Sequence, residues 1–353
     1  MRGAHARVML DLAERGAPEL HGPHLVEWLN RFDAELDNVR QALAWAADHP
    51  AARGALGLRL AAALGWFWFM RGYWEEGRAH MDSARERAPE PAEAAEVAAR
   101  ARALIAAGYI ALFRGEQATA IQQMDEGVAL YERTDDRTGL AWALGSRAYA
   151  TLHAGDPQAA RALAQRGQAV AEGGGRPWAA AYCQFTAWWM ATFVVRDPAQ
   201  LAAIADDAVA ACRRVGTNWL IPICLLGQAM TGLAAGNAAR AEALLHEALA
   251  LERPIGEKMV ILFNLDTLAA AEVALGRVER AARLYGYVEA LAETISYARS
   301  DPQMRANQEA GVAALHQQGD AAQVAGWWAE GRAMTPEQAL EYALQPLPEP
   351  ALA

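Results

Sequence analysis

The feature of this sequence that most constrains its fold is a helix-loop-helix pattern, clearest from Ala61 to Glu90. Gly65 and Trp68 lie on a first predicted helix, Gly72 ends that helix, and Gly77 lies on a second one. Two antiparallel helices approach closely only where the facing side chains are small. We therefore predict that this stretch forms a pair of helices that cross at Gly65 and Gly77.

The same signature recurs along the chain at six predicted loops. Their positions are Gly72, Gly115, Gly155, Arg196, Gly236 and Gly276, which are separated by 43, 40, 41, 40 and 40 residues. This regular spacing is typical of tandem helical repeats, although it is longer than the roughly 34 residues of the common tetratricopeptide unit. We therefore predict an all-α protein, a right-handed α-solenoid of about six tetratricopeptide-like helical pairs with a period of about 40 residues.

Helical segments outside the repeats are predicted to cap both ends of the solenoid. After a break at Pro18 to Pro23, the stretch from His24 to His49 carries apolar residues at helical spacing. Near the other end, Thr335 to Gln338 has the sequence of a capping box, which starts a last helix. The predicted organisation is N-terminal capping helices at 1–50, the tetratricopeptide-like repeat solenoid at 51–295, C-terminal capping helices at 296–344 and a disordered tail at 345–353.

The fourth repeat departs from the others at the positions where its helices should cross. Trp189 and Leu201 stand where the first repeat has Gly65 and Gly77. Side chains of this size hold two helices apart. The departure indicates either a structural kink or a pocket opened for another molecule or segment.

Composition excludes several classes of function. The formal net charge of −10 is unsuited to binding a nucleic acid or an anionic membrane. No apolar run reaches the roughly 18 residues of a membrane span. Asp11 and Glu14 interrupt the N-terminal region where a signal peptide would be apolar. We therefore expect a cytoplasmic protein that binds neither nucleic acid nor membrane directly.

The sequence lacks the motifs of the common catalytic, cofactor and metal sites. Lys258 is the only lysine and follows a glutamate rather than a glycine, which excludes a phosphate-binding P-loop. Cys183, Cys212 and Cys224 show no C-x-x-C spacing, so they predict free thiols rather than a disulfide framework or a structural zinc site. No catalytic residue, metal ligand or cofactor is predicted.

Aromatic and methionine residues give the clearest binding signal. The first helix of a tetratricopeptide unit lines the concave surface, and the repeat register places two rows of side chains there. The first row is Trp66, Tyr109, Tyr149, Met190, Met230 and Ala270, and the second is Phe69, Leu112, Leu152, Phe193, Leu233 and Val273. Such side chains suit a planar ring, a sugar or an apolar helix. The predicted ligand- or partner-binding residues are Trp66, Phe69, Tyr109, Tyr149, Met190 and Phe193. The alternative is that the long helices tighten the superhelix until both rows form core.

Both ends of the chain resemble a known family. The segments that carry the resemblance are LDLAER at 10–15, EWLNRFDAELDNVRQALAWA at 27–46, ERAARLYGYVEAL at 279–291 and WWAEGRAMTPEQALEYAL at 327–344. They are similar to the two ends of the C-terminal tetratricopeptide-repeat sensor region of bacterial SARP-like and LuxR-type ATP-binding transcriptional regulators, the signal-transduction ATPase class that includes relatives of the maltose regulator. The resemblance implies a sensor and protein-interaction module without the ATPase and helix-turn-helix domains of that family. It supplies no catalytic residue.

The leading hypothesis is a non-enzymatic, cytoplasmic sensor. It would bind a partner protein, such as a regulator ATPase or a DNA-binding subunit, or a small-molecule effector in its concave groove. One alternative is a dedicated binding protein for a sugar or an aromatic metabolite. The other is an enzyme on a helical-repeat frame, for which His153, Asp197 and Tyr149 are the candidates.

Overall fold

Six helical pairs, flanked by further helices, make up the structure. The computed structural model describes residues 2–49, 55–88, 93–195, 197–216, 219–298 and 302–345, and every regular element within these ranges is a helix. The predicted all-α helical-repeat solenoid is confirmed. The pairs are α3 (Ala55–Arg71) with α4 (Trp74–Arg87), α5 (Ala94–Phe113) with α6 (Gln117–Tyr131), α7 (Arg137–His153) with α8 (Pro157–Glu172), α9 (Pro177–Val194) with α10 (Pro198–Val215), α11 (Ile221–Ala234) with α12 (Ala238–Glu252), and α13 (Lys258–Ala274) with α14 (Val278–Thr294).

Glycine follows the first helix of five of these pairs because the backbone there enters the left-handed region. The φ angle is 70° at Gly72, 80° at Gly115, 85° at Gly155, 78° at Gly236 and 75° at Gly276. Residues with a Cβ rarely adopt this conformation. Five predicted loop positions are thus tight turns of the structure, and the sixth, Arg196, lies outside the described residues.

The helices of the first repeat cross closely, but the two predicted glycines contact different partners. A Cβ on Gly77 would lie 2.6 Å from the Cβ of Trp68, so α4 approaches α3 at this residue. A Cβ on Gly65 would lie 2.6 Å from the Cβ of Ala106 on α5 and 3.2 Å from Met81 Sδ on α4. The lack of a side chain at Gly77 therefore allows α4 to pack closely on α3, whereas the lack of one at Gly65 also allows α5 of the next pair to pack closely on α3.

Further helices precede and follow the six pairs. The helix α1 (Arg2–Gly16), the 3-10 helix η1 (Ala17–His21) and α2 (Leu25–Asp48) come before α3, and α15 (Pro302–Gln318), α16 (Ala321–Arg332) and α17 (Pro336–Leu344) come after α14. The capping box is present: the Thr335 hydroxyl accepts a hydrogen bond from Gln338 N, and the Gln338 side chain accepts one from Thr335 N. Residues 346–353 of the predicted tail lie outside the described residues.

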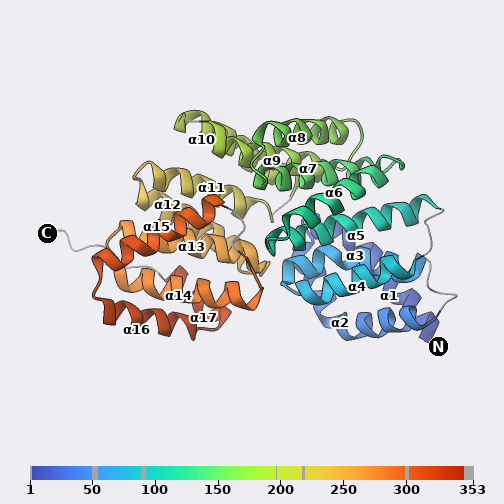
Figure 1. Ribbon diagram of the computed structural model, residues 1–353, viewed down its shortest axis with the longest axis horizontal. Coiled ribbons are helices and arrows are strands. Elements are labelled where there is room, and N and C mark those ends of the chain that lie inside the picture. Colours follow the sequence, from blue (N-terminus) through green and yellow to red (C-terminus); the bar gives the residue numbers. More distant parts are fainter. Residues whose placement is uncertain are drawn as a thin grey trace.

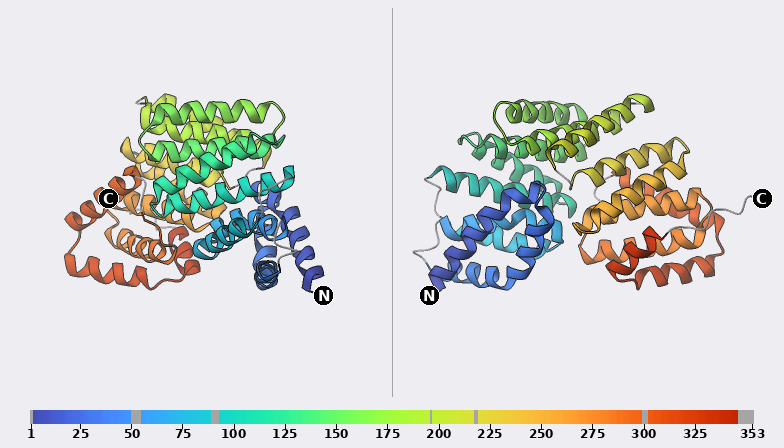
Figure 2. Two further views of the ribbon diagram at one scale, coloured as in Figure 1. Left: turned by 45° about the vertical axis from the view of Figure 1, so that its right-hand side comes forward. Right: turned by 180° about the vertical axis from the view of Figure 1, so that it is seen from behind.

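The solenoid curves until its first and last repeats meet. Figure 1 shows this arc, with α3 to α6 on one side, α7 to α10 at the top and α11 to α14 on the other side. The two sides meet at a seam, where Arg71 Nη1 donates a hydrogen bond to Ile255 O over 2.5 Å and Ala298 N donates one to Phe113 O over 3.1 Å. Figure 2 shows the same arrangement from two further sides. The concave surface is therefore turned toward the inside of the molecule.

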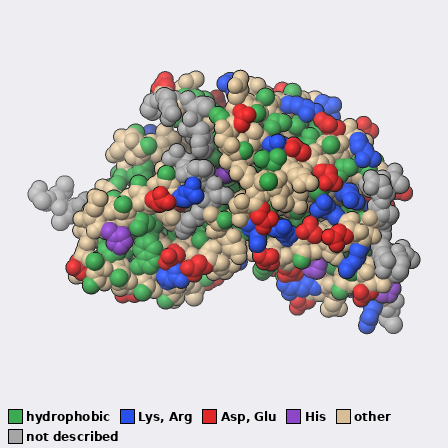
Figure 3. Space-filling model, viewed as in Figure 1, with side chains coloured by type: hydrophobic (Ala, Val, Ile, Leu, Met, Phe, Trp, Pro, Cys, Tyr) green, Lys and Arg blue, Asp and Glu red, His purple; other side chains and the backbone are tan. Residues whose placement is uncertain are grey.

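Acidic and basic side chains are mixed on the surface. On the face shown in Figure 3, Lys and Arg side chains are interspersed with Asp and Glu. Two ion pairs between helices are Arg40 with Glu76, at 2.7 Å, and Arg78 with Glu116, at 2.6 Å. In the part of the chain that the structure describes, no helix is both long enough and apolar enough to cross a membrane.

Candidate functional site

The aromatic half of the predicted binding rows lies inside the curved solenoid. Trp66, Phe69, Tyr109 and Met190 are no more than 6% exposed, and Tyr149 is partly buried. The side chain of Phe193 lies outside the described residues. This burial corrects the expectation of an open aromatic groove, because curvature and contact at the seam cover the concave surface. The four buried side chains form core, and the role in binding of all six predicted residues remains a prediction.

A small cavity of about 60 Å³, the aromatic chamber, lies between these side chains. Its walls include Trp66, Phe69, Tyr109, Tyr149, Trp219 and Glu257. Tyr109 and Tyr182 are hydrogen-bonded through their hydroxyl groups, and burial raises the pKa of Tyr109 above its usual value. The chamber holds a few water molecules at most. An organic ligand would enter it only if a wall residue moved.

Four tryptophans surround His21 beside this chamber. They are Trp66 on α3, Trp142 on α7, Trp178 on α9 and Trp219 just before α11, and we call them the tryptophan cage. The His21 ring stacks on Trp178 with centroids 3.9 Å apart and planes 7° from parallel. Burial, together with the positive charges of Arg102 and Arg176, lowers the pKa of His21 to about 3. His21 is therefore a neutral imidazole near neutral pH.

Two buried carboxyl groups lie in the loop that forms the seam. Glu257 caps α13, because its Oε1 and Oε2 accept hydrogen bonds from Met259 N at 2.9 Å and Val260 N at 2.8 Å. Glu252 Oε1 accepts a hydrogen bond from Glu257 N at 2.8 Å. Burial raises the pKa of Glu257 to about 7, and burial beside the Glu257 charge raises the pKa of Glu252 well above its usual value. The hydrogen bond between Glu252 and Glu257 closes the loop that contains Ile255, the residue whose carbonyl oxygen Arg71 contacts.

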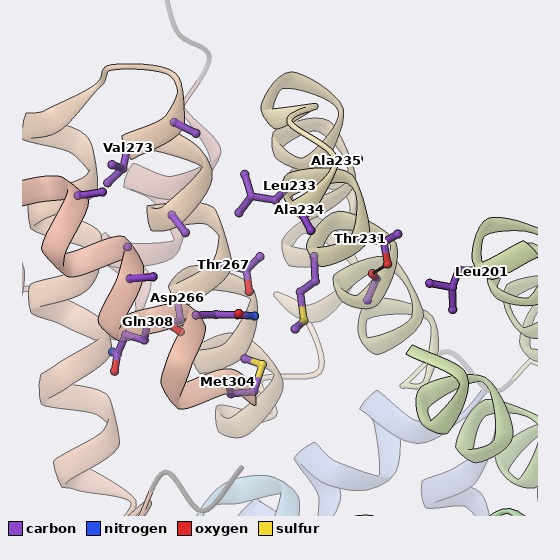
Figure 4. A pocket seen from close by; sticks show the side chains of 18 of the residues that line it. Leu201, Thr231, Leu233, Ala234, Ala235, Asp266, Thr267, Val273, Met304 and Gln308 are labelled. Atoms are coloured by element: carbon purple, nitrogen blue, oxygen red, sulfur yellow. Dashed lines mark hydrogen bonds between the residues drawn. The ribbon is translucent and has the colours of Figure 1, made fainter. Parts of the chain in front are cut away.

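An open cleft of about 670 Å³ lies in the C-terminal half of the molecule, among α11, α13 and α15 (Figure 4). Met230 and Ala270 of the first inward row line it, and so do Leu233 and Val273 of the second row. The sequence placed these residues on the concave surface but put the binding site in the aromatic half. In that other half, Met230, Leu233 and Ala270 are partly exposed to the cleft.

The fourth repeat contributes to the same cleft. Trp189 and Leu201, the two large residues at its predicted crossing, are both in the cleft wall. Beside them lies Gly227 of α11, where a Cβ would come 2.1 Å from the Trp188 ring. Both explanations offered for this repeat, the kink and the pocket, stay predictions, and the cleft is the feature beside which its two large residues lie.

Residues outside the repeats complete the cleft. Met304, Asn307 and Gln308 of α15 form one wall, opposite Thr231 of α11 and beside Thr267 of α13 (Figure 4). Sequence reasoning missed the α15 residues because that helix belongs to no repeat and has no register from which its inward face could be read. The wall is mostly apolar with a few polar groups, which is the usual composition of a small-molecule site.

Two of the three candidates for catalysis are neighbours on one helix. Tyr149 and His153 are one turn apart on α7, with ring centroids 4.6 Å apart, and Asp197 is exposed before α10. The sequence also missed a group of potential metal ligands, Glu242, His246 and Glu272, whose ligand atoms lie within 4.8 Å of one another.

Arginines already neutralise the carboxylates of this group. Arg277 binds Glu242 at 2.5 Å and Glu272 at 3.0 Å, and Arg280 binds Glu272 at 2.7 Å. These fixed positive charges disfavour a cation at the same place.

Comparison with known proteins identifies the fold. No protein-family model matches the sequence, and no significant match is found among curated proteins. Among solved structures, a Rap protein complexed with Competence and Sporulation Factor is similar, with a TM-score of 0.60, 11% sequence identity and coverage of 91% of this chain and 85% of that chain. Aspartyl phosphate phosphatase F from Bacillus subtilis is similar with a TM-score of 0.50, 12% identity and coverage of 81% and 76%. At this identity the similarity shows a shared helical fold.

Proposed function

We propose that this chain is a non-catalytic regulatory module that binds an effector in the cleft among α11, α13 and α15. The observation that carries the proposal is the cleft itself, which brings together inward residues of the fourth, fifth and sixth repeats and one wall of α15. Its volume of about 670 Å³ falls within the range of small-molecule sites, roughly 300–1,000 Å³.

Binding of a ligand in this cleft can change the shape of the solenoid directly. Each repeat of a solenoid contacts mainly its neighbours, so a small change in packing angle accumulates along the chain. A ligand held between α11 and α15 would fix the angle between the fifth repeat and the helices that follow the sixth. A ligand that prefers one such angle shifts the population toward it.

The regulatory part of the proposal is supported by similarity to other proteins in sequence and in fold. The segments at 10–46 and 279–344 resemble the sensor region of ATP-binding transcriptional regulators, and one solved structure of similar fold carries a bound factor. We propose that a partner protein of that regulatory class, such as an ATPase or a DNA-binding subunit, binds the shape that the effector favours.

The test is to fill the cleft with a large side chain and to measure whether the protein still binds an effector. Ala270→Trp places an indole in the cleft, whereas Ala239→Trp places one on the exposed surface of α12 and serves as the control. Each protein is incubated with the small-molecule fraction of a lysate of the source organism and examined by native mass spectrometry. We expect an adduct on the order of a few hundred daltons on the wild type and on Ala239→Trp, but not on Ala270→Trp.

Two outcomes contradict the proposal. One is an adduct that survives in Ala270→Trp, because the ligand then binds elsewhere. The other is that no fraction gives an adduct on the wild type. Melting temperatures of the variants, with and without the active fraction, show that loss of binding is not loss of folding.

A further inference from the structure

The tryptophan cage brings together residues of four different repeats and of the segment that precedes them. His21 is 6% exposed, and its ring centroid lies 5.6 Å from Trp66, 5.7 Å from Trp142, 3.9 Å from Trp178 and 6.0 Å from Trp219. Trp66 also meets Trp142 and Trp219 edge to face, at 5.7 and 5.3 Å. The imidazole therefore lies in an aromatic enclosure, with the face of Trp178 as its stacking platform.

Five buried polar atoms of His21 and the four tryptophans make no hydrogen bond within the described part of the chain. The indole Nε1 atoms of all four tryptophans and His21 Nδ1 are buried, and none of them makes a hydrogen bond to the described residues. Buried polar groups are nearly always hydrogen-bonded, and each exception calls for an explanation. Four indole N–H groups are donors only, so what the enclosure lacks is acceptors.

The present occupant comes from a connection rather than from a repeat. His21 ends η1, and Gly22 and Pro23 separate it from α2. Pro23 is exposed and lies beside Gly216, at the end of α10, so the cage is close to the surface on this side. Rotation of the His21 side chain, next to a flexible glycine, would open the cage without unfolding a repeat.

The chemistry of the occupant indicates the chemistry of a ligand. The charged groups that act on His21 are Arg102 and Arg176, and both are cationic. They disfavour a cation in the cage, although an aromatic enclosure would otherwise suit one. Electron-rich indole faces and unpaired N–H donors instead favour a neutral, flat ring with acceptor nitrogen or oxygen atoms at its edge.

We propose that the tryptophan cage is a binding site for a neutral, planar heteroaromatic ring with hydrogen-bond acceptors, and that His21 is an internal occupant which such a ligand displaces. The aromatic chamber shares Trp66 and Trp219 with the cage and offers additional space of about 60 Å³. This site is separate from the cleft, and the proposal does not depend on the function proposed above.

Benzimidazole is a suitable probe, because it is flat, neutral at about pH 7.5 and has a ring nitrogen that accepts a hydrogen bond. Indane, a bicycle of similar size without nitrogen, is the matched control ligand. Binding is followed by quenching of tryptophan fluorescence and by the shift in melting temperature.

His21→Ala removes the occupant, whereas His21→Phe replaces it with a ring that fills the cage. His49→Ala is the matched control variant, because His49 is an exposed histidine that stacks on a single tryptophan, Trp45, at 4.7 Å.

We expect saturable quenching by benzimidazole with an apparent Kd at least about tenfold lower in His21→Ala than in the wild type, because an internal occupant reduces the competent fraction. His21→Phe should bind more weakly than the wild type, His49→Ala should match the wild type, and indane should bind more weakly than benzimidazole in His21→Ala. The cleft variant Ala270→Trp should bind benzimidazole like the wild type.

Three results would overturn the proposal. They are equal affinity in His21→Ala, the wild type and His21→Phe, equal affinity for indane and benzimidazole, and absence of saturable binding in all variants. If His21→Ala does not fold, the comparison of the wild type with His21→Phe still decides, because only a cage ligand distinguishes these two proteins.

Discussion

Burial of His21 beside positive charges links the stability of the protein to pH. Desolvation and the charges of Arg102 and Arg176 all lower its pKa. An unfolded histidine has a pKa of about 6.5, so between pH 6.5 and about 3 the unfolded chain binds a proton that the folded chain excludes. The contribution of His21 to stability is therefore fully present above pH 6.5 and is lost as the pH falls toward 3.

Replacing His21 with phenylalanine should remove this dependence while a ring still fills the cage. Relative to His21→Phe, the wild type should lose about 1.4 kcal/mol of unfolding free energy for each pH unit below 6.5, or about 2 kcal/mol by pH 5. Urea unfolding of both proteins across this pH range measures the difference. His24→Phe is the control, because it makes the same substitution at an exposed histidine three residues away. Parallel pH dependence of the wild type and His21→Phe would show that His21 is not the responsible group.

The importance of His21 could not be read from the sequence. Its neighbours lie at positions 66, 142, 178 and 219, and no local pattern connects residue 21 with them. The repeat register placed Trp66 on the concave surface, but it gave no reason for a residue of the connection between α1 and α2 to lie there as well.

At the scale of helices, the sequence predicted most where backbone geometry restricts the residue type. Gly72 and its counterparts were recognisable because a left-handed turn selects glycine, and the capping box at Thr335 was recognisable because its two hydrogen bonds require particular side chains. The role of α15 in the cleft was not predictable. Its inward residues, such as Met304 and Gln308, are recognised only from the helices that it packs against.

The close crossing of α3 and α4 gives a prediction at this scale. Gly77→Ala would bring a Cβ within 2.6 Å of the Cβ of Trp68, whose backbone is held in α3, so the two helices must separate. We expect a loss of about 1–3 kcal/mol in unfolding free energy. Gly326→Ala on α16 is the matched control: no atom lies within 4 Å of its added Cβ, so it should be neutral or stabilising by up to about 1 kcal/mol. A loss as large in Gly326→Ala as in Gly77→Ala would mean that helical glycine itself, and not the crossing, is the cause.

At the scale of the whole molecule, the contact between the first and last repeats decides which inward residues are accessible. The period and the two inward rows were predictable, because both follow from local helical spacing. The seam was not predictable, because Arg71 and Ile255 are 184 residues apart and their contact depends on the summed curvature of the intervening repeats. The same curvature buries Trp66 and Tyr109 but leaves Met230 and Leu233 partly exposed at the cleft.

Substitution of Arg71 tests whether the seam contact maintains the curvature of the solenoid. Besides Ile255 O, it binds Asp33 of α2 at 2.7 Å, so it joins the N-terminal helices to the loop before α13. Arg71→Ala removes both contacts, and we expect a loss of about 2 kcal/mol in unfolding free energy, since hydrogen bonds to charged groups contribute roughly 1.5–3 kcal/mol. Because neighbouring repeats remain packed, the folded protein should open rather than unfold, and its radius of gyration in solution scattering should increase.

The control for this experiment is Arg40→Ala, which removes an exposed arginine that pairs with Glu76 and Asp37 on the same side of the molecule. An exposed pair contributes at most about 1 kcal/mol, and its loss should leave the radius of gyration unchanged. An opened seam should also expose the aromatic chamber, so the tryptophan fluorescence of Arg71→Ala should become more accessible to a soluble quencher. If Arg71→Ala keeps the scattering profile and the quenching of the wild type, packing between neighbouring repeats is sufficient to hold the curvature, and the seam contact is its consequence rather than its cause.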